Sequence, residues 1–470
     1  MAVVYAAIIA LESRTAFYLS SVFCMMYLTV CHLWRMYFDY GGYELDITGP
    51  LMVLVQRLSM LAANLDDGES IKKFKQDIFR NGALATSTPI GNRSSSPSPK
   101  DGHKVSLDKL KMSDAQKRFA VYQKPTPMQF ISYCINFQTV IIGPLISYRD
   151  HDIYIRGCEA EHLETEAKRA HFAKHRESIL EARETVIMYG KQAFYYGFLY
   201  IFVAGYFPTN FFLSDTFLQY SFTWRFLYLL LTANFMRQQY YFGWSFSALC
   251  CLLSGLGFSD LDDDMNPKYT LVKNFRFRSV EFAGSLKELI DNWNISTLHW
   301  LRLVIYDRCP RKYASPMVFI ASCIWHGFYP GYYMFFVSMG YFFYVSFTID
   351  QYHYKLIESP LALAHFWSKL SRVFHREVRP AMFKKFLGIL PPERPRKQNW
   401  LERTSIFNVI MAAMGLSEPV SMDTKALDEN TRLFCQRYDF FTWFVTYVVV
   451  NYTATAFVVL AFYDSLVVWA

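Results

Sequence analysis

The sequence is short of charge. Asp, Glu, Lys and Arg make up 19% of its 470 residues, against about 25% in soluble domains. Its nine cysteines include no C-x-x-C pair, so neither a disulfide framework nor a zinc site is indicated. A G-x-S-x-G turn and a complete G-x-G-x-x-G are also missing, which argues against a serine hydrolase elbow and a dinucleotide-binding turn.

The few charges are concentrated, which leaves long windows without Asp, Glu, Lys or Arg. A helix needs about 20 apolar residues to cross a bilayer, and several windows reach that length: Thr15–Trp34, Met128–Ser147, Gln192–Ser214, Tyr240–Ser259, Tyr313–Ile349 and Phe440–Tyr463. The segments 49–65 and 217–236 are weaker candidates because they contain arginine. We therefore predict an all-α, multi-pass membrane protein with about eight to ten membrane segments.

Charge bias predicts how the loops are distributed. Residues 68–127 hold twelve Lys and Arg against five Asp and Glu, residues 350–404 hold eleven against five, and residues 148–185 hold seven against nine. The positive-inside rule places the first two in the cytosol and the third opposite. Spans at 192–212, 217–236 and 240–258 would then return the chain to the cytosol near Asp260.

Composition also suggests a division of the chain. Asn81–Pro99 is rich in Ser, Thr, Pro and Gly and is typical of a disordered linker. We expect N-terminal membrane segments (1–67), a basic and partly disordered loop (68–127), a core (128–349), a second basic loop (350–404) and C-terminal membrane segments (405–470).

His326 is the one ionisable side chain in the window Tyr313–Ile349. An ionisable residue at membrane depth is costly, and its presence suggests a function. Pro330-Gly331 should break the helix just beyond it, and broken backbone at that depth occurs where it lines a cavity. A histidine hydrogen-bonded between helices, or a proton relay in a transporter, would fit the position equally.

Asn294 opens a second segment of interest. Thr297–Arg302 is short and amphipathic, typical of a helix that dips into or lies on the membrane. Asn294 could serve simply as its N-cap. Trp293-Asn294 followed by Trp325-His326-Gly327 nevertheless resembles the paired motifs of the membrane-bound O-acyltransferase family.

The resemblance is closest to the lysophospholipid acyltransferase branch, through Asp291–Ile295 and Ile324–Tyr333. It covers roughly residues 20 to 350, and further matching motifs are Tyr27–Cys31, Phe38–Gly41, Gly49–Met52, Gly143-Pro144 with Ser147-Tyr148, and Gly255–Phe258. Family members usually have more apolar segments before the position of Thr15 and after residues 440–463, so we expect a shortened form.

The resemblance implies broken or re-entrant helices around a central cavity, and transfer of a fatty acyl group from acyl-CoA to the free hydroxyl of a lysophospholipid. Lysophosphatidylethanolamine, lysophosphatidylserine and lysophosphatidylcholine are the expected acceptors, in the endoplasmic reticulum membrane. His326 would be the general base, and Asn294 would orient its imidazole or hydrogen-bond the substrate. The thioester is already activated, so no cofactor or metal is expected.

Candidate substrate-binding residues follow from the motifs and from position. Arg311 and Lys312 lie at the predicted cytosolic mouth of the His326 helix, with Arg308, where acyl-CoA phosphates would enter; positive-inside anchoring explains them as well. The full set of candidates is Trp293, Trp325, Tyr329, Tyr332, Tyr148, Arg311 and Lys312. Helix packing is the preferred explanation for most of the aromatic residues in the stripe that contains Tyr329 and Tyr332.

Three other motifs in the sequence are weaker indications of function. His103–Asp108 has the H-x4-D spacing of an unrelated acyltransferase class but lies beside the Ser/Pro-rich loop. His171 and His175 are spaced like a metal pair but occupy a charged helix without the acidic residue of H-E-x-x-H. The basic loops have little aromatic interleaving, so no nucleic-acid partner is expected. A sterol, diacylglycerol, lysophosphatidylinositol or protein acyltransferase, or a transporter, remains open as an alternative.

Overall fold

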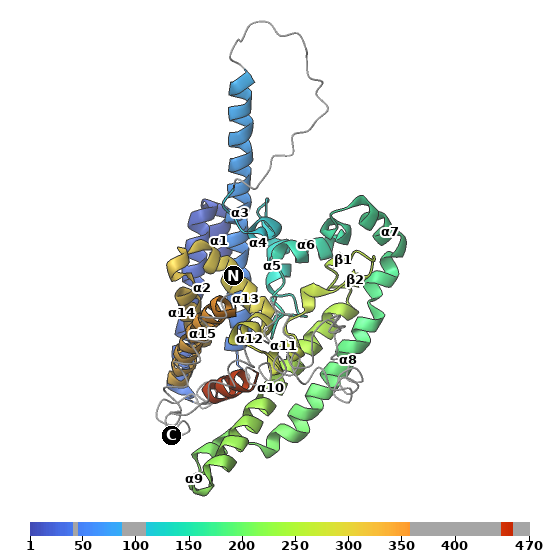
Figure 1. The fold of residues 1–470 in the computed structure, drawn as a ribbon. Helices are drawn as coiled ribbons and strands as arrows, with labels where there is room; N and C mark the ends of the chain where they lie inside the picture. The colour runs from blue at the N-terminus through green and yellow to red at the C-terminus, as the bar shows by residue number, and fades with distance from the viewer. Residues whose placement is uncertain (41–45, 87–109, 358–442, 455–470) are drawn as a thin grey trace. The chain divides into compact units, whose positions relative to one another are not determined.

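The computed structural model describes residues 1–40, 46–86, 110–357 and 443–454 (Figure 1). Most of this part is helical, and the two-residue strands β1 (Asp260–Leu261) and β2 (Pro267–Lys268) form a short antiparallel pair. The all-α prediction is therefore confirmed for the described chain. The fold divides into two compact units.

The first unit comprises residues 1–180, 254–272 and 296–327. Besides β1 and β2, its elements are α1 (Ala2–Ala10), α2 (Ser13–Phe38), α3 (Thr48–Thr86), α4 (Asp114–Phe119), α5 (Pro127–Cys134), α6 (Tyr148–Arg156), η2 (Glu159–His162), α7 (Glu166–Glu181), η6 (Thr270–Val272), α13 (Ile295–Val304), η7 (Tyr306–Arg308) and α14 (Arg311–His326).

The core of this unit is built on α2 and α3, which pack along each other. Leu28 of α2 and Leu61 of α3 are completely buried. Polar groups tie α13 to the same helix: Trp300 Nε1 donates to Ser59 Oγ at 2.8 Å, and Gln56 Nε2 donates to Thr297 Oγ1 at 2.9 Å. Because unpaired polar groups are costly to bury, these bonds fix how α13 sits on α3.

The window Met128–Ser147 is not a single spanning helix, contrary to prediction. Helix α5 ends at Cys134 after eight residues. Arg57 explains the ending: it is 1% exposed, and Nη1 donates to the carbonyl oxygens of Tyr133 and Cys134 at 2.7 and 2.9 Å. These are carbonyls that a longer helix would bond internally. The residues that follow are turns and extended chain.

The charge bias predicted that the loop 148–185 lies on the opposite side of the membrane from 68–127 and from Asp260. This prediction is wrong, because the loop contacts both. Arg149 donates to the carbonyl oxygen of Arg118, and Lys168 pairs with Asp260 at 3.2 Å. A hydrocarbon core about 30 Å thick cannot separate groups in contact. The loop 148–185 therefore lies on the same side as both 68–127 and Asp260, although its charge balance is different.

The second unit comprises residues 181–253, 273–295 and 328–470, described as far as the ranges above allow. Its elements are α8 (Arg183–Phe198), η3 (Leu199–Val203), η4 (Ala204–Tyr206), η5 (Thr209–Leu213), α9 (Asp215–Gln219), α10 (Phe222–Leu253), α11 (Phe277–Glu281), α12 (Leu286–Asn292), α15 (Pro330–Ile357) and a helical stretch at 443–454.

Helix α10 corrects a second span prediction. It runs unbroken for 32 residues alongside α8 (Figure 1) and joins the two segments expected at 217–236 and 240–258. Arg237 marks the expected gap. Its guanidinium instead pairs with Glu281 at 2.7 Å, and both side chains are nearly buried. The charge is thus neutralised within the fold and does not end the helix.

Two helical segments of the described chain are long and apolar enough to cross a membrane: Ser13–Phe38 and Glu166–Leu213. The first contains the window Thr15–Trp34. Of the predicted linker Asn81–Pro99, residues 81–86 are helical and the rest lie outside the described chain. Most of 350–404, part of 440–463 and His103–Asp108 also lie outside it.

Candidate active site

His326 is the last residue of α14, and the predicted break follows at once. Gly327 has a φ of 120°, a conformation that side chains rarely adopt, and α15 starts at Pro330. Proline is favoured at a first helical position because it has no N–H to leave unpaired. The chain therefore turns sharply beside the candidate base, as Pro330-Gly331 predicted.

Trp325 anchors this turn in the first unit. Its indole Nε1 donates to the carbonyl oxygen of Met52 at 3.0 Å, and its ring lies 5.7 Å from that of Trp300. Its own carbonyl oxygen lies 3.1 Å from Nε2 of His32. Both the side chain and the backbone next to His326 are thus held by α2 and α3.

Asn294 belongs to the second unit and lies between α12 and α13. Its φ of 48° is left-handed and differs from the extended backbone of a typical N-cap. Asn274 Nδ2 donates to its Oδ1 at 3.2 Å. The side chain of Asn294 is therefore bonded to a neighbouring segment.

Trp293 is enclosed by aromatic rings of α10. Its ring centroid lies 5.7 Å from that of Tyr240, 5.6 Å from that of Tyr241 and 4.9 Å from that of Trp244, each at a steep interplanar angle. Edge-to-face pairs of this kind add stability beyond the area that they bury. The enclosure fixes the residue before Asn294.

The other candidates are distributed over both units. Tyr148 is buried at the start of α6 with its ring edge-on to Tyr133 at 5.5 Å. In the second unit, the rings of Tyr329 and Tyr332 meet edge-on at 5.7 Å. The first unit holds Tyr148, Arg311, Lys312, Trp325 and His326, and the second holds Trp293, Asn294, Tyr329 and Tyr332.

The basic residues near α14 differ in exposure. Arg311 and Lys312 are exposed in the first turn of the helix. Arg308 is instead nearly buried, with its guanidinium 2.9 Å from the carboxylate of Asp67. It joins η7 to α3, so it is not available at a substrate entrance.

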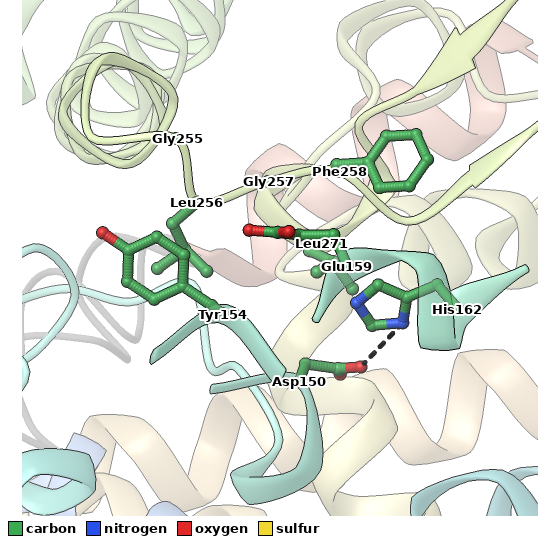
Figure 2. Close-up of a pocket in the computed structure, with 9 residues that line it drawn as sticks. All are labelled: Asp150, Tyr154, Glu159, His162, Gly255, Leu256, Gly257, Phe258 and Leu271. Atoms are coloured by element: carbon green, nitrogen blue, oxygen red, sulfur yellow. Dashed lines mark ion pairs between the residues drawn. The ribbon is translucent and has the colours of Figure 1, made fainter. Parts of the chain in front are cut away.

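A small pocket lies elsewhere in the first unit, between α6, η2 and the loop 255–258 (Figure 2). Asp150 and His162 face each other there at 3.8 Å, and both side chains are 6% exposed. Its volume of about 10 Å³ is near the minimum that one water molecule needs. A pocket of this size cannot take a lipid.

His171 and His175 approach each other in α7, with their ring centroids 4.6 Å apart. Within the described ranges, no three His, Cys, Asp or Glu side chains are arranged to hold a metal ion.

Sequence reasoning missed His32 and Asn274. His32 lies in the charge-free window Thr15–Trp34, so the test of an ionisable residue at membrane depth that found His326 could have found it too. Asn274 lies outside every motif noted in the sequence. Its hydrogen bond to Asn294, 20 residues further along the chain, is visible only in the fold.

Comparison with known proteins identifies the chain's relatives. The model of the membrane-bound O-acyltransferase family matches residues 14–356. Lysophospholipid acyltransferase 6 of Drosophila melanogaster is 30% identical over 318 residues, which are 67% of this chain and 39% of the relative. Human membrane-bound glycerophospholipid O-acyltransferase 1 is 31% identical over 320 residues, covering 67% and 56% of the two chains.

The similarity extends to plants. Lysophospholipid acyltransferase 1 of Arabidopsis thaliana is 28% identical over 324 residues, covering 66% of this chain and 59% of the relative. The chain thus spans about half the length of the relatives that it matches. Because the family model covers most of its residues, including both motifs, the chain belongs to the membrane-bound O-acyltransferase family.

Proposed function

We propose that the protein is an acyl-CoA-dependent lysophospholipid O-acyltransferase that remodels phospholipids. Three relatives from an insect, a human and a plant carry names of lysophospholipid or glycerophospholipid acyltransferases. The observation that carries the proposal is the placement of His326 at the end of α14, directly before the left-handed Gly327. A histidine that terminates a broken helix can present its imidazole to a substrate.

The reaction needs one acyl transfer and two proton transfers. We assign His326 as the general base that takes the proton from the lysophospholipid hydroxyl. The hydroxyl oxygen attacks the thioester carbonyl carbon, and the tetrahedral intermediate collapses with loss of the coenzyme A thiolate. The proton then passes from the imidazolium to the thiolate. General-base catalysis contributes about 10²- to 10⁴-fold.

Asn294 is assigned as a hydrogen-bonding partner in the same reaction. Its amide could orient the imidazole or donate to the oxygen that gains charge in the intermediate. Arg311 and Lys312 are exposed and would attract the phosphates of acyl-CoA. The aromatic candidates Trp293, Trp325, Tyr148, Tyr329 and Tyr332 would contact the lipid substrates.

The setting proposed for this reaction is the endoplasmic reticulum membrane. The family is membrane-bound by its description. Because the window Met128–Ser147 is not one helix and the segments 217–236 and 240–258 are joined in α10, we propose fewer membrane segments than the eight to ten predicted, some of them broken or re-entrant around a central cavity. Acyl-CoA would arrive from the cytosol, and the lysolipid would enter from the bilayer. No cofactor or metal is needed, since the thioester supplies the activation.

A lysolipid panel tests the proposal. Membranes containing the full chain are incubated with labelled acyl-CoA and with lysophosphatidylethanolamine, lysophosphatidylserine, lysophosphatidylcholine, lysophosphatidylinositol, a sterol, diacylglycerol or a peptide. We expect acyl transfer to at least one of the first three. Transfer only to one of the others would indicate another activity of the family. Solute flux without transfer would indicate a transporter and would overturn the proposal.

A further inference from the structure

The residues on either side of Asn294 are paired with a second segment. The backbone N–H of Ile295 donates to the carbonyl oxygen of Asn274 at 2.8 Å, and that of Arg276 donates to the carbonyl oxygen of Asn292 at 3.1 Å. Arg276 Nη1 also donates to Asn292 Oδ1 at 3.1 Å. Residues 274–276 thus hold residues 292–295 at both ends.

Asn294 depends on such support. A φ of 48° is uncommon for a residue with a side chain, and strained backbone at functional sites persists where its surroundings fix it. Asn274 is 2% exposed, so its amide has little water to compete for its hydrogen bonds. It contacts the Asn294 region twice, through its carbonyl oxygen and through the bond from Nδ2 to Asn294 Oδ1 at 3.2 Å.

The direction of the side-chain bond has a chemical consequence. An amide oxygen accepts, and an amide nitrogen donates. Because Asn274 donates to Oδ1 of Asn294, it sets the plane of the Asn294 amide and turns the NH₂ group of that amide away from itself. The NH₂ group is the half of the amide that can donate to a substrate oxygen.

We propose that Asn274 is a positioning residue for acyl transfer: it fixes the Asn294 amide so that the Asn294 NH₂ group is directed at the substrate. The inference rests on the proposed function, in which Asn294 takes part in the reaction. The proposal also decides which of two roles Asn294 has. An NH₂ group can donate to a substrate oxygen, but it cannot accept the N–H of the His326 imidazole and so cannot orient that ring.

A double-mutant cycle tests the proposal in the full chain. Asn274→Ala, Asn294→Ala and the double variant are assayed with acyl-CoA and the lysolipid that the wild type uses best. If Asn274 acts through Asn294, Asn274→Ala lowers kcat at least about tenfold with KM for acyl-CoA within about twofold, and adds nothing in the Asn294→Ala background. Multiplicative losses in the double variant would overturn the proposal.

Asn274→Asp tests the direction of the bond. Aspartate has nearly the same shape but only accepts, so it should lower kcat as much as alanine does. Full activity would mean that the NH₂ group of Asn294 faces residue 274, which contradicts the proposal. Asn266→Asp makes the same chemical change at an exposed turn and should leave kcat within about twofold; an equal loss there would also overturn the proposal.

Folding is monitored separately by the melting temperature and by elution of each variant in detergent. If Asn274→Ala does not fold, Asn274→Leu, which has nearly the same shape as asparagine and no donor, replaces it in the cycle with the same expected non-additivity. A wild type that acylates none of the lysolipids refutes the proposed function, and the role of Asn274 falls with it. An active wild type with unaffected Asn274 variants refutes the role of Asn274 alone.

Discussion

His32 Nε2 lies 3.1 Å from the carbonyl oxygen of Trp325, 293 residues further along the chain. A carbonyl only accepts, so the imidazole donates from Nε2, and Nδ1 is the bare nitrogen of the neutral ring. Nδ1 faces the next turn closely: a Cβ at Gly327 would meet it at 3.2 Å. The first long helix of the chain therefore holds both neighbours of His326 in sequence.

Replacing His32 should impair catalysis more than substrate binding. His32→Leu removes the donor, leaves the Trp325 carbonyl unsatisfied and frees the turn. Because misplacement of a catalytic group by about 1 Å can cost about 10²-fold, we expect kcat to fall about 10- to 100-fold. His32→Gln places an amide donor near Nε2 and should recover most of the activity. Equal losses in both variants, measured as kcat in membranes with matched protein amounts, would contradict this role.

Breaking the buried ion pair in the second unit should destabilise the protein. The Glu281 carboxylate accepts from Arg237 Nε at 2.8 Å and from the hydroxyl of Tyr241 at 2.7 Å. Glu281→Gln leaves the guanidinium buried without its counter-charge, which costs about 3–5 kcal/mol. The melting temperature in detergent should drop markedly. Glu161→Gln, which breaks an exposed pair with Arg156, should cost at most about 1 kcal/mol; equal drops would refute the argument.

Stability should fall as the pH is lowered. His151 of α6 is buried beside Tyr133 and lies 3.2 Å from the hydroxyl of Ser132. Burial, helped by the positive charge of Arg57, lowers the pKa of His151 from 6.5 to about 4. The unfolded chain therefore binds a proton below pH 6.5 that the folded chain does not take up until near pH 4.

The difference in the pKa of His151 between the folded and the unfolded chain lowers the free energy of unfolding below pH 6.5 and has almost no effect above it. Between pH 7 and pH 5 it amounts to about 2 kcal/mol. The melting temperature of the wild type should fall over this range, and His151→Gln, which cannot titrate, should show a smaller fall. The same slope in both proteins would mean that His151 does not stay neutral in the fold.

Three loops of the first unit should be accessible to a labelling reagent from the same side of the membrane. Asp114, Lys174 and Asp263 are exposed and lie in segments that contact one another in the first unit. Single cysteines introduced at these positions should all react with an impermeant maleimide in the same vesicle orientation, above the background of the native cysteines. Reaction of the cysteine at 174 from the opposite side would restore the topology that charge bias predicts.

Charge-free windows predicted some of the helices well. Thr15–Trp34 lies within α2, and the break after His326 occurs where Pro330 indicated it. Both features depend on local properties of the chain, namely apolar length and the missing N–H of proline. Asn294 and His326 were likewise proposed as site residues from motifs that are short in sequence, and their roles stay predictions.

Features that depend on distant partners could not be predicted. The window Met128–Ser147 lacks charge, but α5 ends where Arg57 takes its carbonyls. Conversely, the charge of Arg237 suggested a gap that Glu281 removes by pairing with it. His32 and Asn274 escaped notice because their significance lies in bonds to Trp325 and Asn294. These partners are distant in sequence, so a short window of sequence does not contain them.

His326 is proposed here as the base for acyl transfer to a lysolipid. The most direct measurement is acyl transfer from labelled acyl-CoA to the preferred lysophospholipid by membranes containing wild type or His326→Ala at equal amounts. We expect His326→Ala to lose the activity, by at least about 10²-fold, and to remain in the membrane with an unchanged melting temperature. Activity of His326→Ala within a few fold of the wild type would show that His326 is not the base.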